Sequence, residues 1–386
     1  MHQTRSFIAT NCRSGRRGIF VSVIILGFIL CSILLAHTAF SPGSDYRNVK
    51  QVAIIFRHGD RTPTETYPKD PHINHEWEDG WGALTRKGMA QEYTLGQWIR
   101  SEYGSIIGPK YESSKTLVRS SYADRCIMSA QALLAGLFRP DVGDYFVPEM
   151  PWRPVPVHTT PRNLDKLIVV EADCPRMRAA VAETYKNESK RSDAQLHDYY
   201  KKLEEYTGQR MRTITDVELL YNTLEIEEDN GLTLPDWTKE FYNSEMRDIA
   251  ARSYALFSSN TVLKRLRAGP LLKEVLDRMV DWVDQKNQRT LYLYSAHDVT
   301  LITLLRTMGF EEKMYKPAYG AALIFELVAG KEEHDFEVQI RYLNDTETNE
   351  SHHMRLPACP ERCGLQELYE IWKDVIPEDW DAECKL

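Results

Sequence analysis

The sequence predicts an α/β domain with a mostly parallel sheet, and two observations lead to this class. The first is a short apolar strand followed by a helix, which occurs three times, with strands at 50–56, 116–118 and 291–294. The second is a change of composition between about 165 and 285, where a charged stretch rich in Lys, Glu, Asp and Tyr reads as helical. We therefore expect helices flanking the sheet and a smaller helical insertion.

The first unit begins with the β-branched run at 50–56, which has the composition of a buried strand. A helix is expected from Thr85, whose hydroxyl can cap the first turn, to about Tyr103. The residues expected to face inward on this helix are Met89, Tyr93 and Ile99.

The second unit pairs strand 116–118 with a helix at 124–138 that stops before a proline. In the third unit, strand 291–294 precedes a helix from 298 to about 308, and Gly309 is its C-terminal stop. A further amphipathic helix is marked by apolar residues at helical spacing, which are Leu272, Val275, Leu276, Met279 and Val283.

Composition divides the chain into three parts. Residues 1–44 are a cytoplasmic and signal-anchor or signal-peptide segment. Residues 45–165 and 286–386 form the α/β domain, and residues 166–285 are the helical insertion that would cap it.

The N-terminal segment contains an uncharged apolar run at 19–36 that follows four arginines. The run is about as long as the ~20 residues that span a bilayer. We favour a retained signal anchor over a cleaved signal peptide, although Ala36 and Ala39 leave cleavage open. Both interpretations place the rest of the chain on the lumenal or extracellular side.

The composition excludes several classes of protein. The chain has 386 residues, 42% hydrophobic and 27% charged, which is ordinary for a globular fold and excludes a disordered protein. Its formal net charge is −8. A protein that coats nucleic acid is therefore not expected, because such proteins need basic patches to neutralise phosphates.

Cysteine usage agrees with an oxidising compartment. Two of the seven cysteines lie in the N-terminal segment, and the other five suggest two disulfides and one free thiol. We expect Cys126 to be a buried apolar residue and not a reactive thiol. Three sequons, at Asn187, Asn344 and Asn349, are compatible with glycosylated loops.

Ionisable residues follow the predicted strands directly, at the positions where ligands bind in open α/β sheets. Residues 57–63 read RHGDRTP after the first strand, and residues 295–298 read SAHD after the third. A solvated turn is the alternative for the first motif, but the strand before it is too apolar to be exposed. A metal site at His72 and His75 lacks matching carboxylates or cysteines, so no metal is expected.

These two motifs resemble those of the histidine acid phosphatases. RHGDRTP is similar to the RHGxRxP signature of that family, and SAHD is similar to its HD motif. The resemblance is strongest to the lysosomal and prostatic group and covers the chain from about Val49 to Cys384. It implies a phosphoglycerate-mutase-like fold and the hydrolysis of phosphate monoesters at acidic pH, without a cofactor.

The resemblance implies a role for each matching residue. His58 would attack phosphorus and carry a phosphohistidine, and Asp298 would protonate the leaving alcohol. The implied phosphate ligands are Arg57, Arg61, Arg119 and His297. Arg119 is among them because residues 117–121 resemble the family's strand-to-helix segment. Guanidinium groups suit this task because they can bind two phosphate oxygens at once.

Three alternatives stay open at this point. Asp298 could only cap the helix that follows it, which is a common role for aspartate. The chain could be a phosphoglycerate-mutase-like phosphotransferase, which shares the Arg-His-Gly start, or a catalytically silent binding protein on the same fold. The continuation at 60–63 and the HD pair favour the phosphatases.

The resemblance also implies the disulfides Cys359–Cys363 and Cys174–Cys384. No partners are visible for a further bridge of the family within the helical region. Related enzymes suggest a homodimer. They also suggest a lysosomal, extracellular or membrane-anchored location, with the membrane contacted through the N-terminal segment if that segment is not cleaved.

Overall fold

The computed structural model describes residues 48–386, except 313, 333–334, 349 and 360–361. Residues Asn48–Leu386 form one compact unit. The apolar run at 19–36 and the sequon at Asn349 lie outside the described residues. Among the described residues, no helix is long and apolar enough to cross a membrane.

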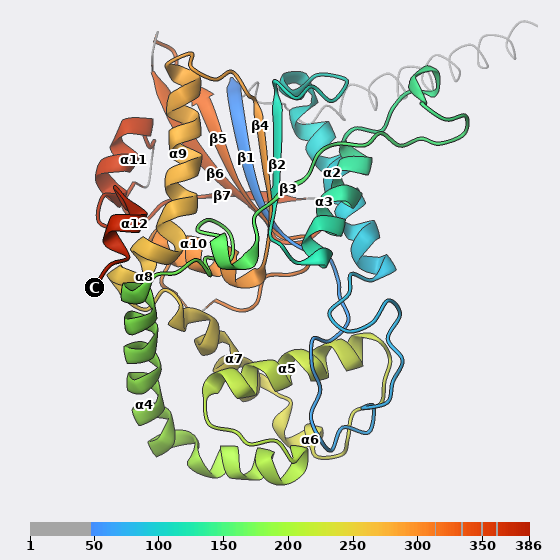
Figure 1. The fold of residues 1–386 in the computed structure, drawn as a ribbon, viewed down its shortest axis with the longest axis vertical. Coiled ribbons are helices and arrows are strands. Elements are labelled where there is room, and N and C mark those ends of the chain that lie inside the picture. The colour runs from blue at the N-terminus through green and yellow to red at the C-terminus, as the bar shows by residue number, and fades with distance from the viewer. Residues whose placement is uncertain (1–47, 313, 333–334, 349, 360–361) are drawn as a thin grey trace, which may run out of the picture. The chain divides into compact units, whose positions relative to one another are not determined.

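Seven strands form one mixed sheet in the order β3-β2-β4-β1-β5-β6-β7 (Figure 1). Their bounds are β1 Val49–Arg57, β2 Thr116–Ser120, β3 His158–Thr159, β4 Leu291–Ala296, β5 Ala322–Ala329, β6 Phe336–Leu343 and β7 Ser351–Met354. Strands β3, β2, β4 and β1 pair in parallel, and the other pairings are antiparallel. The α/β class is confirmed, and the three predicted strands are β1, β2 and β4. The antiparallel half of the sheet was not predicted.

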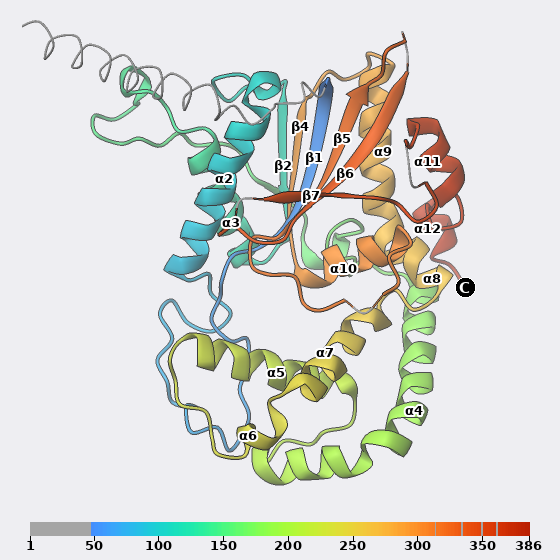
Figure 2. The same cartoon turned by 180° about the vertical axis from the view of Figure 1, so that it is seen from behind.

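Helices cover both faces of the sheet (Figures 1 and 2). They are α2 Arg86–Ile107 and α3 Asp124–Leu137 on one face, with α9 Gly269–Val283, α10 Asp298–Thr307 and α11 Leu365–Trp372 on the other. Alternate side chains of β1 serve the two layers. Val52, Ile54 and Phe56 pack with α2 and α3, whereas Ala53 and Ile55 pack with α9 and α10.

Helix α2 starts where the sequence predicts. The side chain of Thr85 accepts a hydrogen bond from the backbone N–H of Gly88, at 3.0 Å, and so caps the first turn. The helix extends one turn beyond Tyr103. Of the residues expected to face inward, Ile99 is buried, whereas Met89 and Tyr93 are only half-buried. The fully buried stripe includes Leu95, Trp98 and Tyr103 instead.

Four helices form a second layer of structure, which we call the cap: α4 Pro175–Thr207, α5 Ile214–Asp229, α6 Thr238–Phe241 and α7 Ser244–Leu256. They share a hydrophobic cluster that includes Leu203, Val217, Leu224 and Met246. Tyr67, from the loop that follows β1, is buried in the same cluster. The loop after the RHGDRTP motif is therefore held by the cap.

The predicted insertion of residues 166–285 includes more than the cap. Helix α8 Thr261–Leu263, a π-helical turn at Lys264–Ala268 and helix α9 follow α7. Buried residues of α9, among them Leu272 and Met279, belong to the cluster that covers the sheet. The stripe seen in the sequence is thus a sheet-packing face. The division of the chain into domains stays a prediction.

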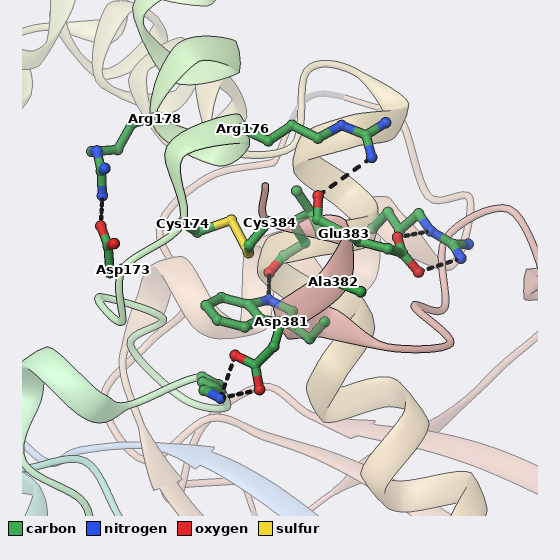
Figure 3. Close-up of a disulfide and its surroundings, with 12 residues drawn as sticks. Asp173, Cys174, Arg176, Arg178, Asp381, Ala382, Glu383 and Cys384 are labelled. Carbon is green, nitrogen blue, oxygen red and sulfur yellow. Dashed lines mark hydrogen bonds and ion pairs between the residues drawn. A yellow bond between two sulfur atoms is a disulfide. The ribbon is translucent and has the colours of Figure 1, made fainter. Parts of the chain in front are cut away.

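Two disulfides lie in the carboxyl-terminal region, and one of them joins it to the start of α4. Cys174 is bonded to Cys384, and Cys359 to Cys363. Figure 3 shows the first of them between the residue that precedes α4 and the end of α12 Trp380–Glu383. The fifth cysteine, Cys126, is free and buried.

Candidate active site

The carboxyl ends of three parallel strands meet at one edge of the sheet. Arg57, the last residue of β1, pairs with Ala296 of β4, and Ser120 of β2 pairs with Ser295. The motifs that follow these strands are therefore brought together. We call residues 57–61, 121–125 and 297–298 the catalytic edge. In Figure 1, α5 and α7 of the cap lie on this side of the sheet.

His58 lies at the centre of the catalytic edge, 2% exposed. Its Nδ1 is 2.8 Å from the carbonyl oxygen of Gly59. A carbonyl can only accept, so Nδ1 carries the proton and Nε2 keeps its lone pair. Burial, followed by the charges of Arg125 and Arg57, holds the pKa of His58 well below its usual value. The ring is therefore neutral and nucleophilic at acidic pH.

Backbone contacts fix the loop that carries His58. A Cβ atom on Gly59 would lie 2.4 Å from the carbonyl oxygen of Gly88, so only glycine allows the loop to approach α2 this closely. The carboxylate of Asp60 accepts a hydrogen bond from the Thr85 hydroxyl at 2.6 Å. The N–H of Asp60 donates to Gln91 at 2.9 Å. The motif is therefore fastened to the first turns of α2.

Arg57 is buried beside His58 and is held from several sides. Its Nη1 donates to the carbonyl of Pro317 at 2.5 Å, and its Nη2 lies 3.0 Å from Oδ2 of Asp298. The guanidinium lies over the ring of Tyr319, 4.0 Å from the ring centroid. Arg61 is also buried and donates to the carbonyl of its neighbour Thr62 at 2.9 Å. Both cations are thus placed before any ligand arrives.

His297 faces His58, with ring centroids 5.6 Å apart. Its Nε2 is 2.8 Å from the hydroxyl of Ser121, and its Nδ1 is 3.4 Å from Nη2 of Arg125. A guanidinium can only donate, so Nδ1 accepts and Nε2 carries the proton. Burial and the charge of Arg125 lower the pKa of His297 to about 3. This ring is also neutral and can donate a hydrogen bond from Nε2.

Asp298 is the first residue of α10, and its side chain is 18% exposed. Burial alone would raise the pKa of its carboxyl, but the charges of Arg57 and Lys316 outweigh burial and lower it to about 2. One carboxylate oxygen accepts from the N–H of Val299 at 2.7 Å, while the other faces Arg57. Asp298 therefore contacts the helix backbone and also faces the site.

The structure does not bring Arg119 to the catalytic edge, which corrects the sequence analysis. Side chains alternate along β2, and Arg119 lies on the α9 face, where its Nη1 is 3.5 Å from Glu274. Arg125, in the first turn of α3, takes the place beside His58 and His297. The sequence did hold a signal for it, because the first turn of a helix that follows a strand points at the same edge.

Sequence reasoning also missed Ser121, Lys316 and Tyr319. Ser121 is the residue directly after β2, and its hydroxyl contacts His297. Lys316 and Tyr319 come from the segment between α10 and β5, which had no predicted element on its carboxyl side. These contacts depend on chain pairing that no local pattern reveals.

The arrangement has the chemistry of an anion site. Arg57, Arg61 and Arg125 surround a neutral imidazole, and Asp298 is the carboxylate that faces them. Fixed guanidinium groups are well suited to a phosphate dianion. In the described part of the chain, no group of three or more His, Cys, Asp or Glu residues is placed to hold a metal ion. His72 instead contacts the carbonyl of Thr233 at 2.9 Å.

Comparison with known proteins agrees with this site. The model of the histidine phosphatase superfamily (branch 2) matches residues 48–343. Human lysosomal acid phosphatase is 34% identical over 367 residues, covering 93% of this chain and 85% of that protein. Bovine prostatic acid phosphatase is 33% identical over 365 residues, covering 92% and 93%. These relatives do not favour the phosphotransferase alternative.

Solved structures support the fold. A Hafnia alvei phytase in complex with tartrate superposes with a TM-score of 0.66 over 88% of this chain and 98% of its own, at 15% identity. A phytase from Citrobacter braakii gives a TM-score of 0.63 over 88% and 100% of the two chains, at 16% identity. The chain belongs to the histidine phosphatase superfamily, branch 2, and is a phosphatase of the acid phosphatase type.

Proposed function

We propose that the chain hydrolyses phosphate monoesters in two steps through a phosphohistidine at His58. One observation carries the proposal: the Nδ1–H of His58 is bound to the Gly59 carbonyl, which leaves the Nε2 lone pair among buried arginines. A buried neutral imidazole between cations has the right state to attack the phosphorus of an anion.

Binding and attack follow from the placed donors. Arg57, Arg61 and Arg125 would bind the phosphate oxygens, and the Nε2–H of His297 would join them by exchanging the Ser121 hydroxyl for a phosphate oxygen. The Nε2 lone pair of His58 forms the N–P bond while the P–O bond to the alcohol breaks. Charge that develops on the oxygens is stabilised by guanidinium groups that are already in place, and such preplaced donors are the main requirement of phosphoryl transfer.

Asp298 would supply the proton that the departing oxygen needs. In the free site its carboxyl is ionised, because Arg57 lowers its pKa. A bound phosphate places negative charge beside Arg57 and so raises the pKa of Asp298. In the second step water attacks phosphorus, its proton passes to Asp298, and the N–P bond breaks to restore His58. Activity should therefore favour acidic pH and decline as Asp298 ionises.

Trapping of the covalent intermediate tests the proposal. Wild-type protein mixed with a ³²P-labelled aryl phosphate and quenched at alkaline pH should carry acid-labile label, and His58→Ala should carry none and lose hydrolysis. His75→Ala is the matched control, because His75 is exposed and contacts Trp77 edge-on, away from the catalytic edge. Label that persists on His58→Ala would contradict the nucleophile assignment.

The location of the chain is proposed from its relatives and its disulfides. Lysosomal and prostatic relatives indicate a lysosomal or secreted protein. The two disulfides support a catalytic unit on the lumenal or extracellular side. The length of the uncharged apolar run at 19–36 supports a retained anchor. Asn187 and Asn344 are exposed and would be glycosylated there. Sequencing of the mature N-terminus tests the anchor, and a start within 40–45 would show cleavage instead.

A homodimer is part of the same proposal. The loop after α3 exposes several apolar side chains, with Val142 81%, Phe146 58% and Trp152 37% exposed. It leads into β3, a two-residue strand at the edge of the sheet. A second copy would cover both the apolar loop and the strand edge. Sedimentation should show a dimer that Phe146→Ser weakens, and a wild-type monomer would contradict this part.

A further inference from the structure

Lys316 lies between the cap and the catalytic edge. Its ammonium group bonds to Glu225 of α5 and donates to Oδ1 of Asn222 on the same helix at 2.7 Å. The side chain is 11% exposed. The next residue, Pro317, accepts the hydrogen bond from Arg57, which in turn contacts Asp298. A cation held by the cap is thus connected to the proposed proton donor through Pro317 and Arg57.

A hydrogen-bond network fixes the orientation of Asn222. Its Nδ2 donates to Oε1 of Glu218 at 3.1 Å and to the hydroxyl of Tyr254 at 3.2 Å. Ser253 donates to the other carboxyl oxygen of Glu218 at 2.8 Å. Because the amide nitrogen is used on the cap side, Oδ1 is directed at Lys316. The ammonium group is therefore held by two side chains of α5, and turning it away would break both hydrogen bonds.

Groups of both charge signs surround Asp298 and Lys316. The titratable groups that interact with Asp298 are Arg57, Lys316, His297, Arg61, Arg125, Cys126, Glu218 and Tyr254. Groups that act on Lys316 are Glu225, Arg57, Asp298, Glu218 and Asp229, with the ring of Tyr221 6.0 Å from its Nζ. Among the cations, Lys316 follows Arg57 in lowering the pKa of Asp298. Arg57 is also a proposed ligand of the phosphate, whereas the ammonium group of Lys316 bonds to Glu225 and Asn222.

We propose that Lys316 is a positioning residue for the proton donor: held by Glu225 and Asn222, its ammonium group opposes protonation of Asp298 and so sets the upper pH limit of hydrolysis. The inference rests on the proposed function, in which Asp298 must hold a proton when the alcohol leaves. A simple strut between the cap and the sheet edge is the competing explanation, because the same ion pair would also join those two regions.

Two substitutions that break the same ion pair separate these explanations. Lys316→Met removes a positive charge near Asp298, and Glu225→Gln leaves that charge without its counterion. If the charge matters, the alkaline limb of the kcat–pH profile moves to higher pH in Lys316→Met and to lower pH in Glu225→Gln. Each shift should be about one pH unit, the lower end of what one nearby charge produces. Lys316→Arg should keep the wild-type limb.

The substrates are chosen so that the limb reports on Asp298. Glycerol 2-phosphate has a poor leaving group that needs a proton, whereas 4-nitrophenyl phosphate does not. Shifts should appear with the first substrate and be much smaller with the second. A strut predicts instead that both charge-removing variants lose kcat without moving the limb, or move it in the same direction. Either result overturns the inference.

Failure here is distinguishable from failure of the proposed function. If the wild-type protein forms no labelled intermediate, the proposed function fails first. If labelling is normal and the limbs do not separate, only the role of Lys316 fails. Thermal unfolding of each variant checks the fold. If Lys316→Met does not fold, Glu225→Gln is compared with Lys316→Arg. The inference then requires that the alkaline limb of Glu225→Gln lies at lower pH than that of Lys316→Arg, and equal limbs would contradict it.

Discussion

The catalytic edge and the cap hold ionisable groups in opposite protonation states: two groups of the edge are deprotonated, and two carboxyls of the cap are protonated. At the edge, burial and the arginines keep His297 neutral, with a pKa of about 3, and the charge of Arg57 keeps Asp298 ionised. In the cap, burial keeps carboxyls protonated, raising the pKa of Glu218 to about 7 and that of Glu227 to about 8. The edge is arranged to attract an anion, and these two buried carboxyls of the cap carry no negative charge while they are protonated.

The two regions therefore respond to pH with opposite signs. Between the lowered pKa of His297 and its usual value, the unfolded chain binds more protons, so the edge gains stability as pH rises from about 3 to 6.5. For Glu218 the folded chain binds more protons between its usual value and about 7, so the cap loses stability as pH rises. The acidic pH at which activity is expected would therefore stabilise the cap, and a bound phosphate would stabilise the edge.

Asp298→Asn should give the largest effect, and this effect should be confined to proton transfer at the catalytic edge. An amide cannot transfer a proton, so hydrolysis of glycerol 2-phosphate should fall by about 10²–10⁴-fold. Hydrolysis of 4-nitrophenyl phosphate should fall much less, because its leaving group departs without a proton. Steady-state kinetics on both esters at pH 5 measure the difference. Equal losses on the two esters would support the alternative in which Asp298 only caps α10.

Arg125→Ala and Arg119→Ala form the next comparison, and it decides which arginine serves the phosphate. Arg125 faces His297 and acts on His58, so its loss should lower kcat/KM by about 10²–10³-fold, as removal of one preplaced donor does. Arg119 pairs with Glu274 on the other face, and its loss should change kcat/KM by no more than a few-fold. The reverse order of effects would restore the original assignment of Arg119.

The difference between these arginines also shows what the sequence can predict. The features that depend on local sequence pattern agree with the structure. They are the strands at 50–56, 116–118 and 291–294 and the helix cap at Thr85. The motif placed His58 and Asp298 correctly at one edge because parallel strands carry their carboxyl ends to the same side.

What the sequence did not predict depends on pairing between distant segments. Arg119 lies in β2 and Arg125 lies six positions later in α3, and the side chain of Arg119 is kept from the edge by the alternation of side chains along β2. Lys316 reaches the site because β5 pairs antiparallel with β1, and β5 was not predicted. Local propensity carries no information about such pairings.

The third comparison is the smallest and concerns the cap. Glu227 faces Asp70, which belongs to the loop after the RHGDRTP motif. Asp70 accepts hydrogen bonds from the hydroxyl of Thr66 and from the N–H of His72. Burial, then the charge of Asp70, raises the pKa of Glu227 to about 8. The carboxyl must lose its proton at alkaline pH inside a buried contact.

Glu227→Gln should therefore stabilise the protein at pH 8 relative to wild type and make little difference at pH 5. The wild-type chain binds more protons folded than unfolded from about pH 4.5 to 8, so its stability falls with pH by at most about 1.4 kcal/mol per unit from this group. Urea unfolding at the two pH values measures the difference, with Glu205→Gln on exposed α4 surface as the control. A benefit of Glu227→Gln that is the same at both pH values would show that the carboxyl does not titrate in this range, and that the cap does not hold it in the protonated state.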